Sequence, residues 1–96
     1  MSRDLTDPLY RAVGIRQTLK AILSDRAETV YLADDADDGM LEEIRHEALA
    51  RRIPVEPVSS MKLLGKRCRI EVAAAAAAKL RADNKDYEFP GVVGIL

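Results

Sequence analysis

Two short stretches of this 96-residue sequence carry side chains suited to noncovalent recognition of a nucleic acid. In the first, Arg16, Gln17 and Lys20 follow Gly14 at the start of an expected helix. Arginine and glutamine offer paired hydrogen-bonding groups that match base edges, and lysine suits a phosphate. A glycine also lets the backbone approach a partner closely. From composition alone, an ordinary solvated helix face is an equally good interpretation.

The second stretch is a basic helix end that runs into a short loop. Lys66 and Arg69 would form a second positively charged wall. The loop tip would present Glu71 between Ile70 and Val72, whose apolar side chains suit an unstacked base. The two stretches together favour a surface for a shaped nucleic acid over bond-making chemistry.

The acidic turn from Asp34 to Gly39 resembles a calcium-binding loop but lacks its ligand spacing. Counted from Asp35, the twelfth position is His46, where such a loop needs a glutamate. We expect Asp37 or Asp38 to cap the following helix instead. His46 has no second His or Cys at ligand spacing and is expected to be solvated. We therefore expect no metal and no cofactor.

Cys68 is the candidate for nucleophilic chemistry. Its basic neighbours Lys66, Arg67 and Arg69 would lower the pKa of the thiol. A catalytic cysteine also needs a partner base, and the sequence shows no histidine placed for that role. We expect Cys68 to be a small, semi-buried packing residue, and the protein not to be an enzyme.

Composition and charge favour a globular protein with one focused basic patch. The 48% hydrophobic content supports a packed core, and a single cysteine fits a reducing compartment. Neither a signal sequence nor a membrane-spanning stretch is recognisable, so we expect a cytoplasmic protein. We also expect it to be a monomer. Residues 1–48 carry a net charge of −5 and residues 49–96 a net charge of +4. The positive charge is concentrated between Lys62 and Arg81, which suits a structured nucleic acid.

The pattern of apolar residues predicts alternating helices and strands. The first expected element is a helix beginning at Thr6, with Leu9, Ala12 and Val13 inward. The elements expected after it are a helix over 16–23, a strand over 29–33, a helix over 40–51, a strand over 54–58 and a helix capped by Ser59 or Ser60. The inward residues expected for the helix over 16–23 are Ile15, Leu19, Ile22 and Leu23. Those expected for the helix over 40–51 are Leu41, Ile44, Ala48 and Leu49, and those for the last helix are Met61, Leu63 and Leu64.

The alanine run from Ala73 to Ala78 can be read in two ways. Helix propensity favours a helix, whereas the alternating order of elements favours a strand. We predict a short helical turn over Ile70–Val72 and then a strand that ends near Leu80. If the alanines were helical, the apolar end of the chain would supply an edge strand. We expect one domain over residues 1–80 and a tail over 81–96.

Four blocks of the sequence resemble the kink-turn RNA-binding ribosomal proteins of the L-seven-Ae family, most closely its small bacterial members. These blocks are Gly14–Lys20, where the bacterial form reads Gly-x-Lys-Gln-Thr-x-Lys, then Leu32–Asp37, Leu64–Lys66 and Ile70–Ala74. The resemblance covers roughly residues 13–80. It implies a three-layer α/β/α sandwich around a mixed four-stranded sheet, with the alanine run entering a strand.

The resemblance also implies a partner and a set of contacts. The partner would be a structured RNA, ribosomal or other noncoding, that contains a kink-turn. This motif is a duplex bent by a bulge beside tandem sheared G·A pairs. Gly14, Arg16, Gln17 and Lys20 would meet the G·A pairs and nearby backbone, and Ile70, Glu71 and Val72 would meet the bulge. Lys66 matches the family's second helix-end motif. The alternative is a protein-interaction module on the same fold that uses the acidic side, Asp34 to Glu47.

The sequence departs from the family pattern at two of these positions. Arg16 stands where bacterial relatives usually have lysine, which keeps the charge but changes the hydrogen-bond geometry. Arg69 stands where the family usually has glycine before the loop. If this position has a positive φ, arginine there costs about 1 kcal/mol or more of backbone strain.

Overall fold

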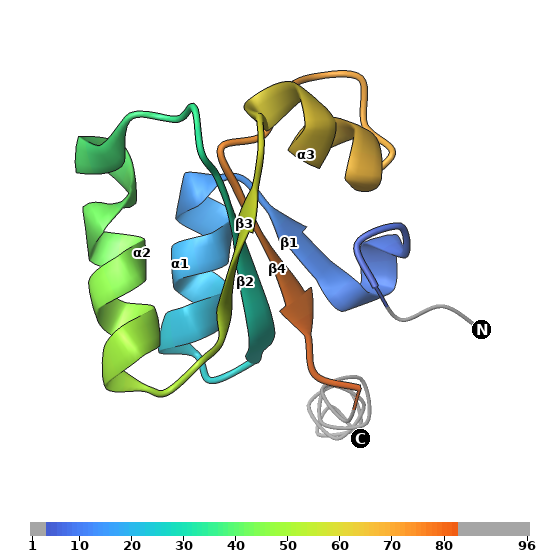
Figure 1. Ribbon diagram of the computed structural model, residues 1–96. Helices are drawn as coiled ribbons and strands as arrows, with labels where there is room; N and C mark the ends of the chain where they lie inside the picture. Colours follow the sequence, from blue (N-terminus) through green and yellow to red (C-terminus); the bar gives the residue numbers. More distant parts are fainter. Residues whose placement is uncertain (1–3, 83–96) are drawn as a thin grey trace.

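A mixed sheet with the strand order β1-β4-β2-β3 forms the centre of the computed structural model, which describes residues 4–82 (Figure 1). Its strands are β1 (Arg11–Val13), β2 (Ala27–Ala33), β3 (Val55–Val58) and β4 (Ala76–Leu80). β4 pairs antiparallel with both β1 and β2, and β2 pairs parallel with β3. The predicted mixed four-stranded sheet is confirmed.

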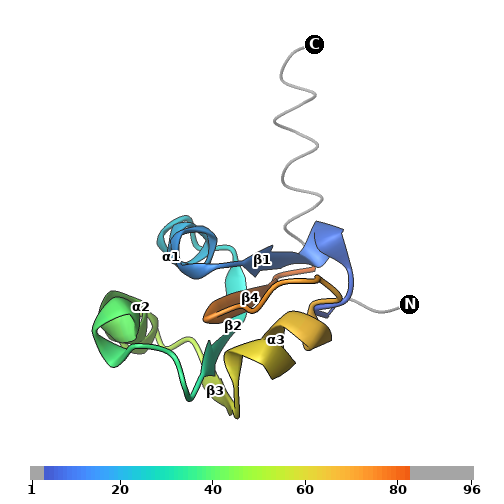
Figure 2. The ribbon, with the colours of Figure 1, turned by 90° about the horizontal axis from the view of Figure 1, so that it is seen from above.

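Three α-helices cover the two faces of this sheet in residues 4–82. They are α1 (Ile15–Leu23), α2 (Asp38–Ala50) and α3 (Met61–Arg67). α1 and α2 lie on one face and α3 lies on the other, which gives the predicted three layers (Figure 2). None of the helices in the described part of the chain has the length and apolar character needed to cross a membrane.

Alternation of side chains along β2 divides the core into two halves. Val30 and Leu32 pack in the half beneath α1 and α2, with Ile22, Leu41 and Ile44. Tyr31 and Ala33 point to the opposite half, beneath α3, as expected for a strand with period two. That second half is completed by Leu5, Val58, Leu64, Cys68, Ala74 and Ala77.

The alanine run is a central strand, as predicted from the order of elements. Ala76, Ala77 and Ala78 are all 0% exposed, because helices cover both faces and β1 and β2 flank both edges. A full set of sheet hydrogen bonds and burial therefore overrides the helix propensity of alanine. The strand begins at Ala76, so the part of the prediction that began it at Ala73 is wrong.

Two predicted helical segments are wrong. Asp7, rather than Thr6, caps a short 3-10 turn, η1 (Pro8–Tyr10), and the chain then enters β1. Ala12 and Val13 lie in that strand because pairing with β4 satisfies their backbone groups. The predicted turn over Ile70–Val72 is an irregular loop, since the chain folds back towards α3 there. The predicted tail lies outside the described residues from position 83 onward.

The other helices and strands lie where they were expected, with shifted ends. Asp37 caps α2 through a 2.8 Å bond from the Gly39 amide, and Ser60 caps α3 through a 3.0 Å bond from the Leu63 amide. Three leucines expected inside are exposed, namely Leu23, Leu49 and Leu63. Successive side chains of an α-helix are rotated by about 100° around its axis. Each of these leucines therefore points away from the side on which its buried neighbour lies, which is Ile22, Ala48 or Leu64.

All three α-helices end in the same left-handed turn without a glycine. The residues at this position are Asp25, Arg52 and Arg69, with φ values of 62°, 58° and 59°. After α3, the Arg69 amide donates to the Lys66 carbonyl at 2.9 Å and the Ile70 amide donates to the Gly65 carbonyl at 3.1 Å. This pair of bonds is the Schellman arrangement, in which glycine is the usual residue. The positive φ suspected at Arg69 is therefore present.

Gly65 permits the close return of the chain onto α3. A Cβ built at this position would lie 2.1 Å from the Val72 carbonyl oxygen and 3.2 Å from its carbon. Further along, the Ala74 amide donates to the Met61 carbonyl at 3.0 Å. The segment between α3 and β4, residues 68–75 and here named the α3–β4 loop, is thus fixed against its own helix.

Replacement of Arg69 by glycine should relieve strain in this loop. We expect Arg69→Gly to raise the free energy of unfolding by about 0.5–1 kcal/mol, the left-handed penalty less the extra freedom of an unfolded glycine. Urea denaturation measures the change. Arg69→Ala removes the same charge but keeps a Cβ and should give no gain. Arg52→Gly, at the end of α2, should give a similar gain. Equal stability of Arg69→Gly and Arg69→Ala would contradict the strain argument.

Replacement of Gly65 by alanine should disrupt the loop. The new Cβ must displace the Val72 backbone, so we expect a loss of about 1–3 kcal/mol in the free energy of unfolding. Thermal or urea denaturation tests this. Gly39→Ala is the control, because its Cβ would meet only the Asp37 Oδ1 at 3.2 Å. A loss at position 65 no greater than at position 39 would show that the loop can move freely.

Candidate nucleic-acid interface

The two predicted polar stretches lie at the same end of the sheet (Figure 1). The Gly14 amide donates to the Ala76 carbonyl at 2.8 Å, which places the start of α1 beside the start of β4. The Ala33 amide donates to the Ala75 carbonyl at 3.0 Å and fixes the last part of the α3–β4 loop in the same region. The central strand therefore brings together segments that are about fifty residues apart in the sequence.

The first wall of the candidate interface is the start of α1. Gly14 adopts φ 101° and ψ 159°, a conformation that side chains with a Cβ rarely reach. Apart from its two chain neighbours, no atom of the described residues lies within 4 Å of the place where its Cβ would be, so the space in front of the backbone is open on that side. Arg16, Gln17 and Lys20 are exposed, while Thr18, Ala21 and Ile22 face the core. Among residues 4–82 no side chain caps α1, which leaves the positive end of the helix available to a polar partner.

The second wall is the α3–β4 loop with the end of α3. Lys66, Arg69, Glu71 and Val72 are exposed, and Val72 is 69% exposed. Ile70 differs from the expectation for a loop tip, because its side chain packs partly against the core beneath α3. An apolar residue after the left-handed turn commonly makes such a contact. Ile70 therefore helps to hold the loop, and Val72 is its exposed apolar residue.

Four cations at this end of the sheet have no carboxylate partner in the described part of the chain. Arg16, Lys20, Lys66 and Arg69 form no ion pair with any residue in the range 4–82. Four cations elsewhere do have carboxylate partners: Arg45 with Asp38, Arg51 with Glu47, Lys79 with Glu28, and Arg81 with Asp25. Arg52, after the end of α2, also lacks one within residues 4–82, so the interface is distinguished by the grouping of its unpaired cations. Within residues 4–82 the cations of the candidate interface are therefore not held in ion pairs, which favours an anionic partner.

The acidic turn performs a structural role in the fold. Asp37 caps α2, and Asp35 accepts a 2.8 Å bond from the Met61 amide at the start of α3. His46 lies exposed on α2. Between positions 4 and 82, no cluster of three or more His, Cys, Asp or Glu side chains could hold a metal ion. These carboxylates orient helices, and of the two predicted caps of α2, Asp37 and Asp38, the structure shows Asp37 in that role.

The site predicted from the sequence does not include Arg67, although this residue lies between the two predicted site residues Lys66 and Arg69. Its guanidinium carbon is 5.1 Å from the centroid of the Tyr31 ring, a cation–π arrangement. Tyr31 belongs to β2, so this contact depends on the packing of α3 on the sheet. The only available sequence signal was the basic cluster itself.

Cys68 is a packing residue, with 0% exposure and a place in the core beneath α3. Burial raises the pKa of its thiol, although Arg11 and Arg67 act in the opposite direction. The expected lowering of the pKa by basic neighbours is therefore outweighed by desolvation.

The buried thiol should react slowly with thiol reagents. We expect labelling of the folded protein by Ellman's reagent at pH 7.5 to be at least about 100-fold slower than labelling in urea, because reaction requires an exposed thiolate. Raising the pH should increase the folded rate only above the usual cysteine range. A fast reaction of the folded protein at neutral pH would support a nucleophilic role for Cys68.

Comparison with solved structures supports the description of the fold. A 15.5-kD RNA binding protein of Giardia lamblia superposes with a TM-score of 0.73 and 23% identity, over 90% of this chain and 72% of that one. A protein of unknown function from Bacillus halodurans gives a TM-score of 0.72 at 19% identity, over 81% and 78% of the two chains. At these identities the likeness concerns the fold alone.

Comparison of sequences gives the family. RNA-binding protein YbxF of Geobacillus stearothermophilus is 44% identical over 69 residues, which are 72% of this chain and 84% of that protein. RNA-binding protein TTE2299 of Caldanaerobacter subterraneus is 39% identical over 71 residues, 74% and 87% of the two chains. The profile of the ribosomal protein L7Ae/L30e/S12e/Gadd45 family matches residues 8–88. This chain therefore belongs to the ribosomal protein L7Ae/L30e/S12e/Gadd45 family.

Proposed function

We propose that this protein binds structured RNA and stabilises a kink-turn through the surface formed by α1 and the α3–β4 loop. The observation that carries the proposal is the meeting of these two segments at one end of the sheet, with exposed cations that have no carboxylate partners among residues 4–82. Relatives of 39–44% identity are named RNA-binding proteins, which supports RNA as the partner.

The proposed contacts differ between the two walls. Arg16 and Gln17 would contact the sheared G·A pairs, with Lys20 on the adjacent phosphates, because these side chains are exposed beside the open backbone of Gly14. Lys66 and Arg69 would contact the backbone from the other wall. Glu71 and Val72 would lie against the bulged nucleotides, with Ile70 supporting them from beneath.

The proposed mechanism is binding without catalysis. A kink-turn exchanges between extended and bent forms, and only the bent form would offer the G·A pairs and the bulge to both walls at once. The protein would therefore shift the equilibrium of the RNA by its preference for one state. We further propose that it acts as a monomer, since both walls come from one chain. The location that we propose is the cytoplasm.

Loss of a base contact should weaken binding of the kink-turn. We expect Arg16→Ala and Gln17→Ala each to reduce the binding free energy by about 1–3 kcal/mol. Titration of a fluorescently labelled kink-turn RNA at fixed salt measures this. Arg52→Ala is the matched control. It removes a cation just after the end of α2, and α2 ends at the other end of the sheet from the candidate interface (Figure 1), so the affinity should be unchanged.

The same titration needs a control RNA in which Watson–Crick pairs replace the G·A pairs. We expect only weak, salt-sensitive binding to this RNA. Unchanged affinity in both α1 variants would refute the assigned surface. Equally weak binding of the unaltered protein to both RNAs would favour the protein-interaction alternative on the acidic side.

A further inference from the structure

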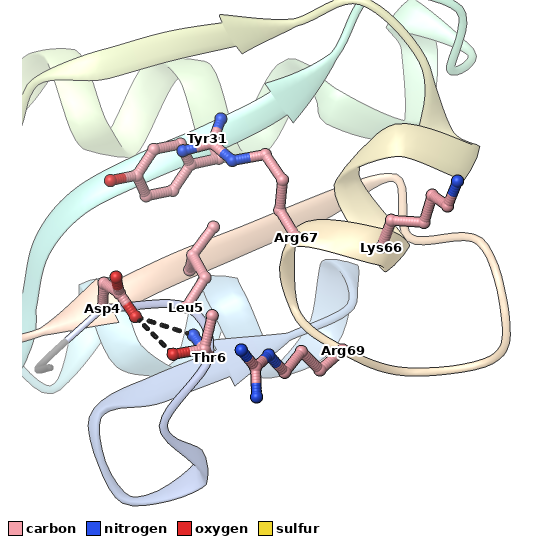
Figure 3. A pocket seen from close by; sticks show the side chains of 7 residues that line it. All are labelled: Asp4, Leu5, Thr6, Tyr31, Lys66, Arg67 and Arg69. Atoms are coloured by element: carbon pink, nitrogen blue, oxygen red, sulfur yellow. Dashed lines mark hydrogen bonds between the residues drawn. The ribbon is translucent and has the colours of Figure 1, made fainter.

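A pocket of about 220 Å³ adjoins the candidate interface, between the N-terminal segment and the end of α3 (Figure 3). Its lining residues are Asp4, Leu5, Thr6, Tyr31, Lys66, Arg67 and Arg69. Lys66 and Arg69 also belong to the second wall, so the pocket continues directly from that surface. Its volume is below the roughly 300–1,000 Å³ that is usual for small-molecule sites.

The pocket is preformed because its two sides are bonded to each other. Leu5 is 3% exposed and packs into the core beneath α3, which holds the N-terminal segment in place. The Arg11 guanidinium donates to the Leu5 carbonyl at 2.9 Å and also to the Cys68 carbonyl at the end of α3. One arginine thus joins the N-terminal segment to the helix end on the opposite side.

The charge in the pocket is predominantly positive. Figure 3 shows Arg67 lying over Tyr31 and Arg69 extending towards Thr6. Neither arginine has a carboxylate partner within residues 4–82. The Asp4 Oδ1 accepts bonds from the Thr6 amide at 2.9 Å and the Thr6 hydroxyl at 2.8 Å. Burial, followed by Glu56, raises the pKa of Tyr31, so the phenol adds no negative charge at neutral pH.

We propose that this pocket holds a backbone phosphate of the RNA strand that runs past the second wall, with Arg67 and Arg69 as the donors. The proposal rests on the proposed RNA binding and extends it to a residue outside the predicted site. Guanidinium groups bind phosphate oxygens through paired donors, and stacking on Tyr31 restricts Arg67 before the RNA arrives. A small, open, positively charged pocket fits a single phosphodiester group.

The test compares charge removal on the protein with charge removal on the RNA. Single neutral methylphosphonates are placed along the strands of a kink-turn RNA with extended arms, and affinity is measured for the unaltered protein and for Arg67→Met. We expect Arg67→Met to bind the unmodified RNA about fivefold more weakly, with a salt slope reduced by about 1. At one position outside the G·A pairs, the methylphosphonate should weaken the unaltered protein but not Arg67→Met.

Two further variants separate a phosphate contact from a packing effect. Arg67→Lys keeps the charge and should restore most of the salt slope, while Arg52→Met removes an arginine elsewhere and should change neither quantity. Urea denaturation of each variant confirms that it is folded. The proposal is overturned if every methylphosphonate affects the unaltered protein and Arg67→Met by the same factor, or if Arg67→Met binds like the unaltered protein.

Failure of the phosphate-pocket proposal can be distinguished from failure of the kink-turn proposal. If the unaltered protein binds the kink-turn and the Watson–Crick control alike, kink-turn recognition fails, and the pocket is judged by the methylphosphonate comparison in the control RNA. A free phosphate ion as the ligand would appear in calorimetry as binding of inorganic phosphate that Arg67→Met abolishes. Such phosphate binding, combined with no methylphosphonate position whose effect depends on Arg67, would overturn the proposal.

Discussion

The fold depends on the burial of a strand of small side chains between helices on both of its faces. β4 has neighbouring strands on both edges, and its three alanines are fully buried. A larger side chain at these positions would push α1 or α3 away from the sheet, because protein interiors tolerate little extra volume. The same strand fixes the candidate interface, since the Gly14 amide bonds to its first residue. The packing of β4 in the core therefore also determines where the candidate interface lies.

The α3–β4 loop combines rigid support with local strain. Its support comes from Gly65, from the Ala74–Met61 hydrogen bond and from the partly buried Ile70. Its strain lies at Arg69, which adopts a conformation that favours glycine. The helix ends at Asp25 and Arg52 have the same backbone without glycine, so the strain alone does not mark a functional site. What distinguishes Arg69 is the position of its side chain, which lines the pocket next to Arg67.

The sequence predicted the order of most elements because local signals and the alternation of the fold agreed. Asp37 and Ser60 are typical helix caps, and both are observed in that role. Leu49 was misplaced because it follows the buried Ala48 and an apolar pattern does not fix the edge of a buried face. The sequence predicts a helix where β1 forms, because three residues carry too little periodicity and only pairing with β4 makes them a strand. The stacking of Arg67 on Tyr31 joins residues from two elements and leaves no local signal.

The proposed binding of RNA by a chain of net charge −1 follows from where its charges are paired. An ion pair at the surface reduces the attraction of its cation for a phosphate. The phosphate must either displace the paired carboxylate or bind beside its negative charge. Arg45, Arg51, Lys79 and Arg81 have such partners, whereas the cations of the candidate interface have none among residues 4–82. Near this end, Asp35 and Asp37 accept bonds from backbone amides at helix starts, which holds these carboxylates at the helix starts although they keep their negative charge. At physiological salt, charges more than about 8 Å away are largely screened. An approaching phosphate would therefore respond to the local unpaired cations rather than to the net charge of the protein.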